Sequence, residues 1–417
     1  MSLISITMAK IRILAIPSDA HGVGKYRIIN PYSHLQEKYP DDFHIDIKFD
    51  VADKDEEFNN YDIVVAHSVI HKDSAYENNI QRVQWLKKKG IIVVIDADDY
   101  WSPDFRHPMY QYIKQEEIDK KKVVLLQSAS YVTTTTPFFR DTLMKKLSIK
   151  NVLVFPNAID ETEPQFIPKP TESDKIRFGW LGGSSHLHDI ELIQSGINVT
   201  QDYAKDKVQF VLCGFDLRGF INEINKQTKE VKKRPIKPEE TVWYQYEKIF
   251  THDYKVLDAE YVKFLKLFVE SDYNDIDKPY RRRWTKEISK YALNYNTFDV
   301  SLAPLVDTMF NNNKSQLKAI EAGFHKKALI ASECMPYTLD LIGTTTKGGQ
   351  TNPKGNALLV SPSKNHKQWA QHMKRLIDNP NMIEDLGNKL YETVRVAYSL
   401  NKVSQDRAQF FKSLINN

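Results

Sequence analysis

The sequence has few cysteines and no long apolar run, and these absences narrow the kind of protein it encodes. Only Cys213 and Cys334 occur in 417 residues, with no CxxC spacing and no nearby histidine pair, which argues against a disulfide framework and a cysteine metal site. No stretch of about 18 apolar residues is present, so we expect no membrane-spanning helix. The opening residues 1–7 lack the basic flank and the length of a signal peptide, and we expect a cytoplasmic protein.

The charged residues are nearly balanced. The chain has 58 basic and 54 acidic residues and a net charge of +4, which is too mild to indicate nucleic acid as a partner. Short basic clusters nevertheless occur at 87–89, 120–122, 232–234 and 281–283. Most such runs are solvated surface, but they also suit peripheral contact with an anionic membrane or another polyanion. The length and the apolar content of 41% predict a globular chain of two domains.

Strand-like segments alternate with helical ones along most of the chain. The strands are expected at 11–16, 61–66, 90–96, 131–135 and 152–155, and again at 175–181, 208–213, 298–303, 328–332 and 357–360. In the second half we expect helices near 191 and at 280–294, 314–323 and 366–378. This alternation predicts an α/β fold with a parallel sheet covered by helices in each half. Residues 161–174 contain three prolines and little apolar sequence, which predicts a linker.

The stretch 302–323 carries the strongest functional signal. It ends a strand, crosses a polar loop and opens a predicted helix on which Lys314, Lys318 and Glu321 share one face at i, i+4 and i+7. Ammonium groups and backbone N–H groups at a helix start favour a phosphate, and a carboxylate two turns later can accept hydrogen bonds from sugar hydroxyls. The pattern suits a nucleotide diphosphate with its ribose. A solvated charged face with an internal Lys318–Glu321 pair is the alternative.

Glycine-bearing loops follow the first strand of each predicted domain. Gly22 and Gly24 precede a helix and would let the backbone approach an anion, although a plain tight turn explains them as well. The GxxxxGK[ST] pattern of a P-loop is not satisfied. Gly182, Gly183 and Ser184 hold the same place in the second domain and offer consecutive small residues at a helix start.

Three polar residues end the neighbouring strands of the first domain. His67 follows the strand at 61–66 and would face a ligand cleft, with a satisfied core histidine as the alternative. Asp96 and Asp98 end the strand at 90–96 and could hold a divalent metal or accept hydrogen bonds from sugar hydroxyls. The alternative is a structural role, in which these aspartates cap the loop between the strand and the next helix.

Taken together, these motifs resemble a known family. Residues 154–160 look like the "PNGVD" element of glycosyltransferase family 4, and residues 303–321 look like the donor motif of its bacterial and phage members, with the pattern FN…KSxLKxxE. Residues 95–101, 132–137 and 177–186, together with Asp189, match the same subgroup. The resemblance spans about residues 10 to 400 in the expected order.

The resemblance implies a GT-B fold, with two Rossmann-like doubly wound domains that face each other across a cleft. Residues 8–160 would form the acceptor domain and 161–174 the linker. Residues 175–395 would form the nucleotide-sugar donor domain, with an elaboration near 215–277. The helix at 396–417 would pack back on the N-terminal domain.

The resemblance also implies roles for individual residues. Glu321 matches the second glutamate of the family's E-x7-E motif and would bind the ribose hydroxyls, whereas Asn313 occupies the place of the first. The arginine and lysine that usually neutralise the diphosphate are missing after the strand at 175–181, so Lys314, Lys318 or the 281–283 cluster would take that role. The catalytic candidates are His67, Asp96, Asp98 and Asn313. The donor-binding candidates are Gly22, Gly24, Gly182, Gly183, Ser184, Asn311, Lys314, Ser315, Lys318 and Glu321.

The implied activity is transfer of a sugar from a nucleotide-diphosphate sugar to an acceptor hydroxyl, with retention of anomeric configuration. No cofactor or metal would be required, because helix dipoles and cations would stabilise the leaving diphosphate. The acceptor is left open among a glycan, a lipid-linked glycan, a protein and hydroxylated nucleobases in DNA. A non-catalytic protein that binds a nucleotide sugar or glycan, and a sugar-nucleotide epimerase, are the other classes. The enzyme would be cytoplasmic or peripheral to the inner face of the membrane.

Overall fold

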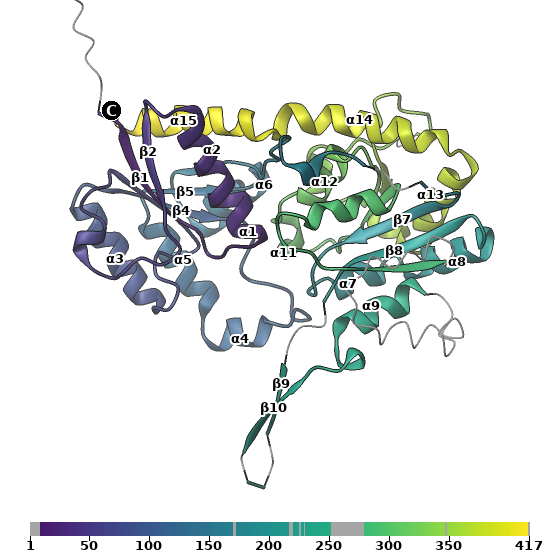
Figure 1. The fold of residues 1–417 in the computed structure, drawn as a ribbon, viewed down its shortest axis with the longest axis horizontal. Helices are drawn as coiled ribbons and strands as arrows, with labels where there is room; N and C mark the ends of the chain where they lie inside the picture. The colour runs from purple at the N-terminus through teal and green to yellow at the C-terminus, as the bar shows by residue number, and fades with distance from the viewer. Residues whose placement is uncertain are drawn as a thin grey trace, which may run out of the picture. The chain divides into compact units, whose positions relative to one another are not determined.

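The chain forms two compact units. The structure, a computed structural model, describes residues 9–169, 172–216, 220–224, 227–228, 230–251, 279–346 and 348–415. Unit 1 comprises Met1–Glu163, Asp307–Ile320 and Val394–Asn417, and unit 2 comprises Pro164–Val306 and Glu321–Thr393. Each unit is built on one six-stranded parallel sheet with helices packed against it (Figure 1). The prediction of two parallel-sheet α/β domains is therefore confirmed.

The sheet of unit 1 has the strand order β2-β1-β3-β4-β5-β6, with every neighbouring pair parallel. Its strands are β1 (Ile11–Ile16), β2 (Phe43–Ile47), β3 (Ile63–His67), β4 (Ile92–Ala97), β5 (Tyr131–Thr134) and β6 (Val152–Val154). The sequence analysis did not predict β2. This strand lies at the sheet edge and buries only Phe43 fully, so it lacks the apolar run of its neighbours.

Alternate residues of β1 face opposite sides of this sheet, as the two-residue period of a strand requires. Leu14 and Ile16 pack with residues of α3, α5 and α6, whereas Ile13 and Ala15 pack with residues of α2 and α15. Because helices cover both faces of the sheet, the sequence of β1 is almost entirely apolar. The helices of unit 1 are α1 (Gly22–Gly24), α2 (Asn30–Lys38), α3 (Tyr76–Lys88), α4 (Tyr110–Gln115), α5 (Ile118–Ser128), α6 (Pro137–Leu147), α11 (Met309–Asn312) and α15 (Leu400–Ile415).

Helix α6 shows how local sequence sets an element boundary. Thr136 has an extended backbone and its side chain accepts a hydrogen bond from Phe139 N at 3.1 Å, which caps the helix start. Pro137 occupies the first turn, where its missing N–H costs nothing. The helix ends at Ser148, whose φ of 53° is left-handed and stops the helical hydrogen bonding.

The sheet of unit 2 has the order β11-β8-β7-β12-β13-β14 and is also parallel throughout. Its strands are β7 (Ile176–Leu181), β8 (Val208–Phe215), β11 (Tyr280–Trp284), β12 (Val300–Ala303), β13 (Ala328–Ser332) and β14 (Leu358–Val360). Helices α7 (Leu187–Glu191), α8 (Gln194–Ala204), α9 (Val242–Phe250) and α13 (Asn365–Asp378) belong to this unit, while α12 (Leu317–Phe324) and α14 (Asn381–Tyr398) begin in one unit and end in the other. The core contains Phe178 and Trp180 of β7 together with Trp369 of α13.

The prediction of a helix over 280–294 is wrong. The first five of these residues form β11, which pairs with β8, and Tyr291–Thr297 form a 3-10 helix. Three consecutive arginines are atypical of a buried strand, and this misled the sequence analysis. Arg282 is accommodated because its guanidinium donates to both carboxylate oxygens of Glu247 at 2.6 Å and lies 3.8 Å from the ring centroid of Phe215.

The segment between β8 and β11 contains a second, smaller sheet. Strands β9 (Phe220–Ile224) and β10 (Val231–Pro235) pair with each other antiparallel and leave the six-stranded sheet (Figure 1). Of the elaboration predicted near 215–277, the part from 252 onward lies outside the described residues. Among the described helices, none is both long enough and apolar enough to cross a membrane.

The predicted linker and the C-terminal helix both pack against one of the units. Within the predicted linker 161–174, Pro164–Phe166 form a 3-10 turn, and Phe166 is buried against His325 in unit 2. At the other end of the chain, Phe411 of α15 is fully buried and lies 5.9 Å from Tyr32 of α2 in unit 1.

Candidate functional site

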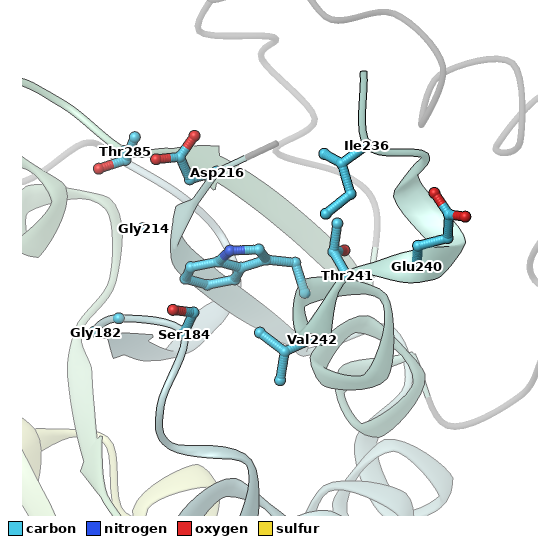
Figure 2. Close-up of a pocket in the computed structure, with 11 residues that line it drawn as sticks. Gly182, Ser184, Gly214, Asp216, Ile236, Glu240, Thr241, Val242 and Thr285 are labelled. Carbon is cyan, nitrogen blue, oxygen red and sulfur yellow. The ribbon is translucent and has the colours of Figure 1, made fainter. Parts of the chain in front are cut away.

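A pocket of about 430 Å³ opens at the carboxyl ends of β7, β8 and β11 in unit 2. This is the end of a parallel sheet where open α/β folds bind ligands. Figure 2 shows Asp216 and Thr285 together at one side and Ile236 near Glu240 at the other. The pocket is lined by Gly182, Gly183, Ser184, Gly214, Asp216, Ile236, Glu240, Thr241, Val242, Trp243 and Thr285. Three predicted donor residues, at 182–184, thus lie together in its wall.

Gly214 allows the two loops of the pocket to come close together. Its φ is +99°, and a Cβ at this position would lie 2.3 Å from the carbonyl oxygen of Gly182. Only glycine tolerates this backbone conformation at this distance. The end of β8 therefore packs directly on the loop after β7, and backbone atoms rather than side chains form this part of the wall.

Helix α9 holds the glycine loop in place. Thr241 caps the helix by accepting a hydrogen bond from Tyr244 N. One turn later, the Tyr246 hydroxyl accepts from His186 N at 2.8 Å and donates to Gly183 O at 3.3 Å. Burial raises the pKa of Tyr246, so the phenol stays protonated and can donate. The sequence analysis missed this residue because it lies in the predicted elaboration, where the aromatic run around it was the only signal.

Asp189 joins the same loop to the segment after β12. One of its carboxylate oxygens lies 2.8 Å from His186 Nδ1, and the other accepts a hydrogen bond from Val306 N at 2.8 Å. These two contacts fix neighbouring carboxyl ends of the sheet relative to each other. They give the pocket rim a rigid support from a residue that the family resemblance also matched.

Glu321, the predicted ribose ligand, is buried in unit 2. Tyr295 donates its hydroxyl to Glu321 Oε2 at 3.0 Å, and its ring stacks on His325 with a centroid distance of 5.0 Å. Burial, together with the nearby Lys327, lowers the pKa of His325 to about 3, so this imidazole stays neutral. The carboxylate is thus oriented by a rigid aromatic stack. Nothing in the sequence pattern linked Tyr295 to Glu321, because 26 residues separate them.

The pocket lining contains the carboxylates Asp216 and Glu240 but no lysine or arginine among the described residues. Arg234 donates to both carboxylate oxygens of Glu240, at 2.8 and 2.6 Å. The expectation that the 281–283 cluster neutralises a diphosphate is contradicted for Arg282, since its guanidinium is committed to Glu247. A cation for a diphosphate therefore has to come from outside this lining.

In unit 1, the structure brings His67 and Asp98 together. His67 Nε2 lies 2.8 Å from Asp98 Oδ1, and Nδ1 is buried without a hydrogen-bond partner among the described residues. A proton on Nε2 would satisfy one oxygen of the carboxylate, and the Asp98 side chain is the more exposed member of the pair, at 20% against 8%. Burial opposes ionisation of Asp98, but the neighbouring His67 and Lys122 outweigh it and lower the pKa of this carboxyl.

Asp96 has a different environment from Asp98. Arg27 donates Nε and Nη2 to the Asp96 carboxylate at 2.9 and 2.7 Å, and Thr133 donates its hydroxyl at 2.5 Å. Arg27 also donates to Phe155 O at 2.6 Å and to Asn157 Oδ1 at 3.1 Å. Both members of the pair are almost fully buried. This bidentate pair argues against the catalytic role predicted for Asp96.

Arg27 was not among the residues predicted from the sequence. It is a single charged residue within the apolar run 26–29 that follows the glycine loop, and its charge within that run was the available signal. It lies in a π-helical turn, Lys25–Ile29, and is one of the largest fully buried side chains of the chain.

The loop with Gly22 and Gly24 is closed on itself. Asp19 Oδ1 accepts hydrogen bonds from His21 N at 2.7 Å and from Gly24 N at 3.2 Å. A Cβ on Gly24 would lie 1.8 Å from the carbonyl oxygen of Asp19, so glycine is needed for packing within the loop. The N–H of Gly24 is used inside the loop, contrary to the expected anion contact.

The donor-motif segment 307–320 belongs to unit 1. The expectation that Lys314 shares a helical face with Lys318 and Glu321 is wrong, because α11 ends before Lys314 and α12 begins only after it. Asparagine side chains compete for backbone groups and interrupt helices, and here Asn313 Nδ2 donates to Met309 O at 2.7 Å.

Other donor candidates of this segment make local contacts. The Ser315 hydroxyl accepts from Asn157 Nδ2 at 3.0 Å, and the ammonium group of Lys314 lies 4.8 Å from the ring centroid of Phe310. Asn311 is buried, and its N–H donates to the capping Thr308. Among the described residues, no group of three or more histidine, cysteine or carboxylate side chains is arranged to hold a metal ion.

No protein-family model matches the chain, and no curated protein matches it. Solved structures do match over nearly the full length of both chains. The sucrose-phosphate synthase of Thermosynechococcus elongatus has a TM-score of 0.62 at 14% identity, and the match covers 98% of this chain and 100% of that one. HepE of Anabaena in complex with UDP has a TM-score of 0.57 at 12% identity, with 97% and 100% covered. A glycosyltransferase of Rickettsia africae has a TM-score of 0.58 at 12% identity, with 98% and 100% covered. The chain therefore has the GT-B fold of glycosyltransferases.

Proposed function

We propose that the chain is a glycosyltransferase that moves a sugar from a nucleotide-diphosphate sugar to an acceptor hydroxyl. The observation that carries this proposal is the pocket at the carboxyl ends of β7 and β8, in a GT-B fold, with the small residues 182–184 in its wall. Retention of configuration and independence of metal belong to the same proposal and come from the family 4 resemblance.

The pocket suits a nucleotide in size and lining. Its volume of about 430 Å³ falls within the range of small-ligand sites. Gly182 and Gly183 carry no side chain that would keep a ligand away from the backbone. From the family resemblance we assign the ribose hydroxyls to Glu321, a buried residue of the same unit outside the pocket lining, which Tyr295 holds in one orientation. Because the structurally similar HepE is a complex with UDP, uridine nucleotides are the first donors to test.

In the proposed reaction, the bond between the anomeric carbon and the donor phosphate oxygen breaks, and the acceptor oxygen bonds to the same carbon on the same face. The acceptor proton passes to the leaving phosphate oxygen. We assign the His67–Asp98 pair to acceptor positioning, since the partly exposed carboxylate of Asp98 can accept a hydrogen bond from the acceptor hydroxyl while His67 fixes its orientation. The acceptor itself is proposed only as a hydroxyl compound, with glycans, lipid-linked glycans, proteins and modified DNA all to be tested.

A second candidate is a protein that binds a nucleotide sugar without turnover. One observation favours it: Asn313 stands where the family has a glutamate, and its side chain donates to Met309 O. An amide cannot supply the negative charge of that glutamate. Turnover distinguishes the two candidates.

The test is a panel of UDP-, GDP-, ADP- and CDP-sugars in which release of the nucleoside diphosphate is followed with and without acceptors. Glu321→Ala should raise KM for the donor by about 10- to 100-fold, because hydrogen bonds to a charged group are worth about 1.5–3 kcal/mol. Glu333→Ala removes an exposed glutamate of the same unit and should leave KM unchanged.

Release from one donor, weakened only by Glu321→Ala, would support the transferase. Donor binding without release under any acceptor would favour the non-catalytic protein. Absence of both binding and release would refute the proposal.

A further inference from the structure

The β9–β10 ribbon is an exposed element that the proposed reaction does not use. Among the described residues its two strands pair with each other and with no further strand, in a two-stranded antiparallel sheet. Figure 1 shows it extending away from the rest of unit 2. A two-stranded ribbon of this kind buries little apolar surface by itself and gains stability when it packs against a further surface.

One face of the ribbon carries exposed apolar side chains. The register pairs Phe220 with Pro235, and the two-residue period of the strands places Val231 on the same face, with Asn222 and Lys233 paired between them. The side chains of Phe220 and Val231 are 63% and 61% exposed. Exposed apolar side chains at both ends of one face, with a lysine between them, suit a contact surface.

The same ribbon is strongly basic. Residues 220–237 include six basic and two acidic residues, an excess of four that equals the net charge of the whole chain. Lys232, Lys233 and Lys237 are exposed, and no ion pair joins them to any other described residue. The ammonium group of Lys233 lies 5.2 Å from the ring centroid of Phe220, so a cation and an apolar ring share one surface.

We propose that the β9–β10 ribbon docks unit 2 on a membrane surface rich in anionic lipid. Phe220 and Val231 would enter the boundary between headgroups and acyl chains, and the lysines would contact headgroup phosphates. Exposed aliphatic surface beside lysine favours a lipid bilayer over nucleic acid, because a valine side chain neither stacks on a base nor forms hydrogen bonds. Membrane docking is independent of sugar transfer, so either proposal can fail while the other stands.

The base of the ribbon is firmly joined to unit 2. Arg234 at the end of β10 donates to Glu223 of β9 at 2.5 Å and to Glu240 at 2.8 and 2.6 Å. The backbone N–H of Lys237 also donates to Glu240, at 2.8 Å. The adjacent Ile236 lines the nucleotide pocket. A surface that binds the ribbon would therefore hold the pocket at a defined place beside the membrane.

The test measures binding of the full chain to sedimented vesicles of phosphatidylcholine with and without phosphatidylglycerol. Lys232→Gln with Lys233→Gln should weaken binding to the anionic vesicles about 25-fold, since each lysine near such a surface contributes about 1 kcal/mol. The matched control is Lys88→Gln with Lys89→Gln, which removes two exposed lysines from unit 1 and should have no comparable effect.

A second measurement reports insertion directly. Because Cys213 and Cys334 are both buried, a cysteine introduced by Phe220→Cys can be labelled selectively with an environment-sensitive dye. Its emission should shift to the blue with anionic vesicles, whereas Phe105→Cys, at another exposed phenylalanine, should show no shift. The proposal would be overturned if both pairs of lysine substitutions weakened vesicle binding equally, or if the chain bound neutral vesicles as well as anionic ones. It would also be overturned if the chain bound no vesicles, or if the emission of the dye on Phe220→Cys did not shift. Preferential binding to a DNA duplex that prevents vesicle binding would also overturn it.

Discussion

Replacing Asp96 by asparagine separates a structural from a catalytic role for this carboxylate. The Asp96→Asn side chain keeps the shape but removes the charge that compensates Arg27, which is only 1% exposed. Arg27 would keep its hydrogen bonds to Phe155 O and Asn157, but its buried charge would lose its directly paired carboxylate and retain only the more distant Asp98. Breaking a buried pair in this way costs about 3–5 kcal/mol of folding free energy.

The pH dependence of this loss follows from the pKa of Asp96. Burial alone would raise it, but the charge and hydrogen bonds of Arg27 outweigh burial and lower it. A carboxyl with a lowered pKa in the folded state adds stability above its unfolded pKa, and this contribution is lost as the pH falls through the folded pKa. The difference between the native chain and the variant should therefore be full at neutral pH and shrink in strong acid.

The assay is urea unfolding followed by circular dichroism, with hydrogen exchange on peptides from β4 to assign the change to unit 1. Asp62→Asn is the matched control, because Asp62 also pairs bidentately with an arginine, Arg12, but at the surface. Exposed pairs contribute about 0–1 kcal/mol, so the control should stay near the native stability. An Asp96→Asn variant that unfolds like the native chain yet loses turnover would refute the structural assignment.

Three further changes test the surroundings of the proposed nucleotide site. Tyr295→Phe removes the hydroxyl that donates to Glu321, and calorimetry should show about 5- to 10-fold weaker nucleotide binding; unchanged affinity would contradict this positioning role. His325 has a pKa of about 3 in the folded state, so below about pH 6.5 the unfolded chain takes up a proton that the folded chain refuses. Stability should fall by up to about 1.4 kcal/mol per pH unit from this group down to about pH 3, and His325→Phe should flatten the acid side of a stability profile; an identical slope would exclude the effect. Gly214→Ala combines a φ of +99° with a Cβ 2.3 Å from Gly182 O, and should lower stability by about 2 kcal/mol or more; a native melting temperature would show that the loops can separate without cost.

Much of the sheet framework could be predicted from hydrophobic runs alone. The strands at β1 and β13 begin and end at the predicted residues, because fully buried parallel strands have apolar side chains on both faces. The prediction failed where burial depends on partners distant in sequence. Arginine-rich β11 is a strand only because Glu247 and Phe215 accept Arg282.

The candidate site shows the same division. The ends of β3 and β4 were expected to present His67 and Asp98, and these two side chains do meet, since neighbouring parallel strands end at the same edge of the sheet. The different environments of Asp96 and Asp98 could not be predicted. Asp96 is held by Arg27 from 69 residues away, and no local pattern encodes such a pair. The polar run around Asn313 likewise delayed the start of α12 to Leu317, where periodicity alone predicted a helix from Lys314.

The return of α15 to unit 1 has a consequence for how the chain folds during synthesis. Ala408 and Phe411 complete the apolar cluster on one face of the first sheet. The ribosome makes roughly 240 residues between Glu163 and α15, which takes about 10–50 s at usual rates of elongation. Throughout that interval the apolar face of the nascent first sheet is covered by α2 but lacks α15. We expect chaperone occupancy of this face to end when α15 emerges, which ribosome-bound chains of increasing length would reveal.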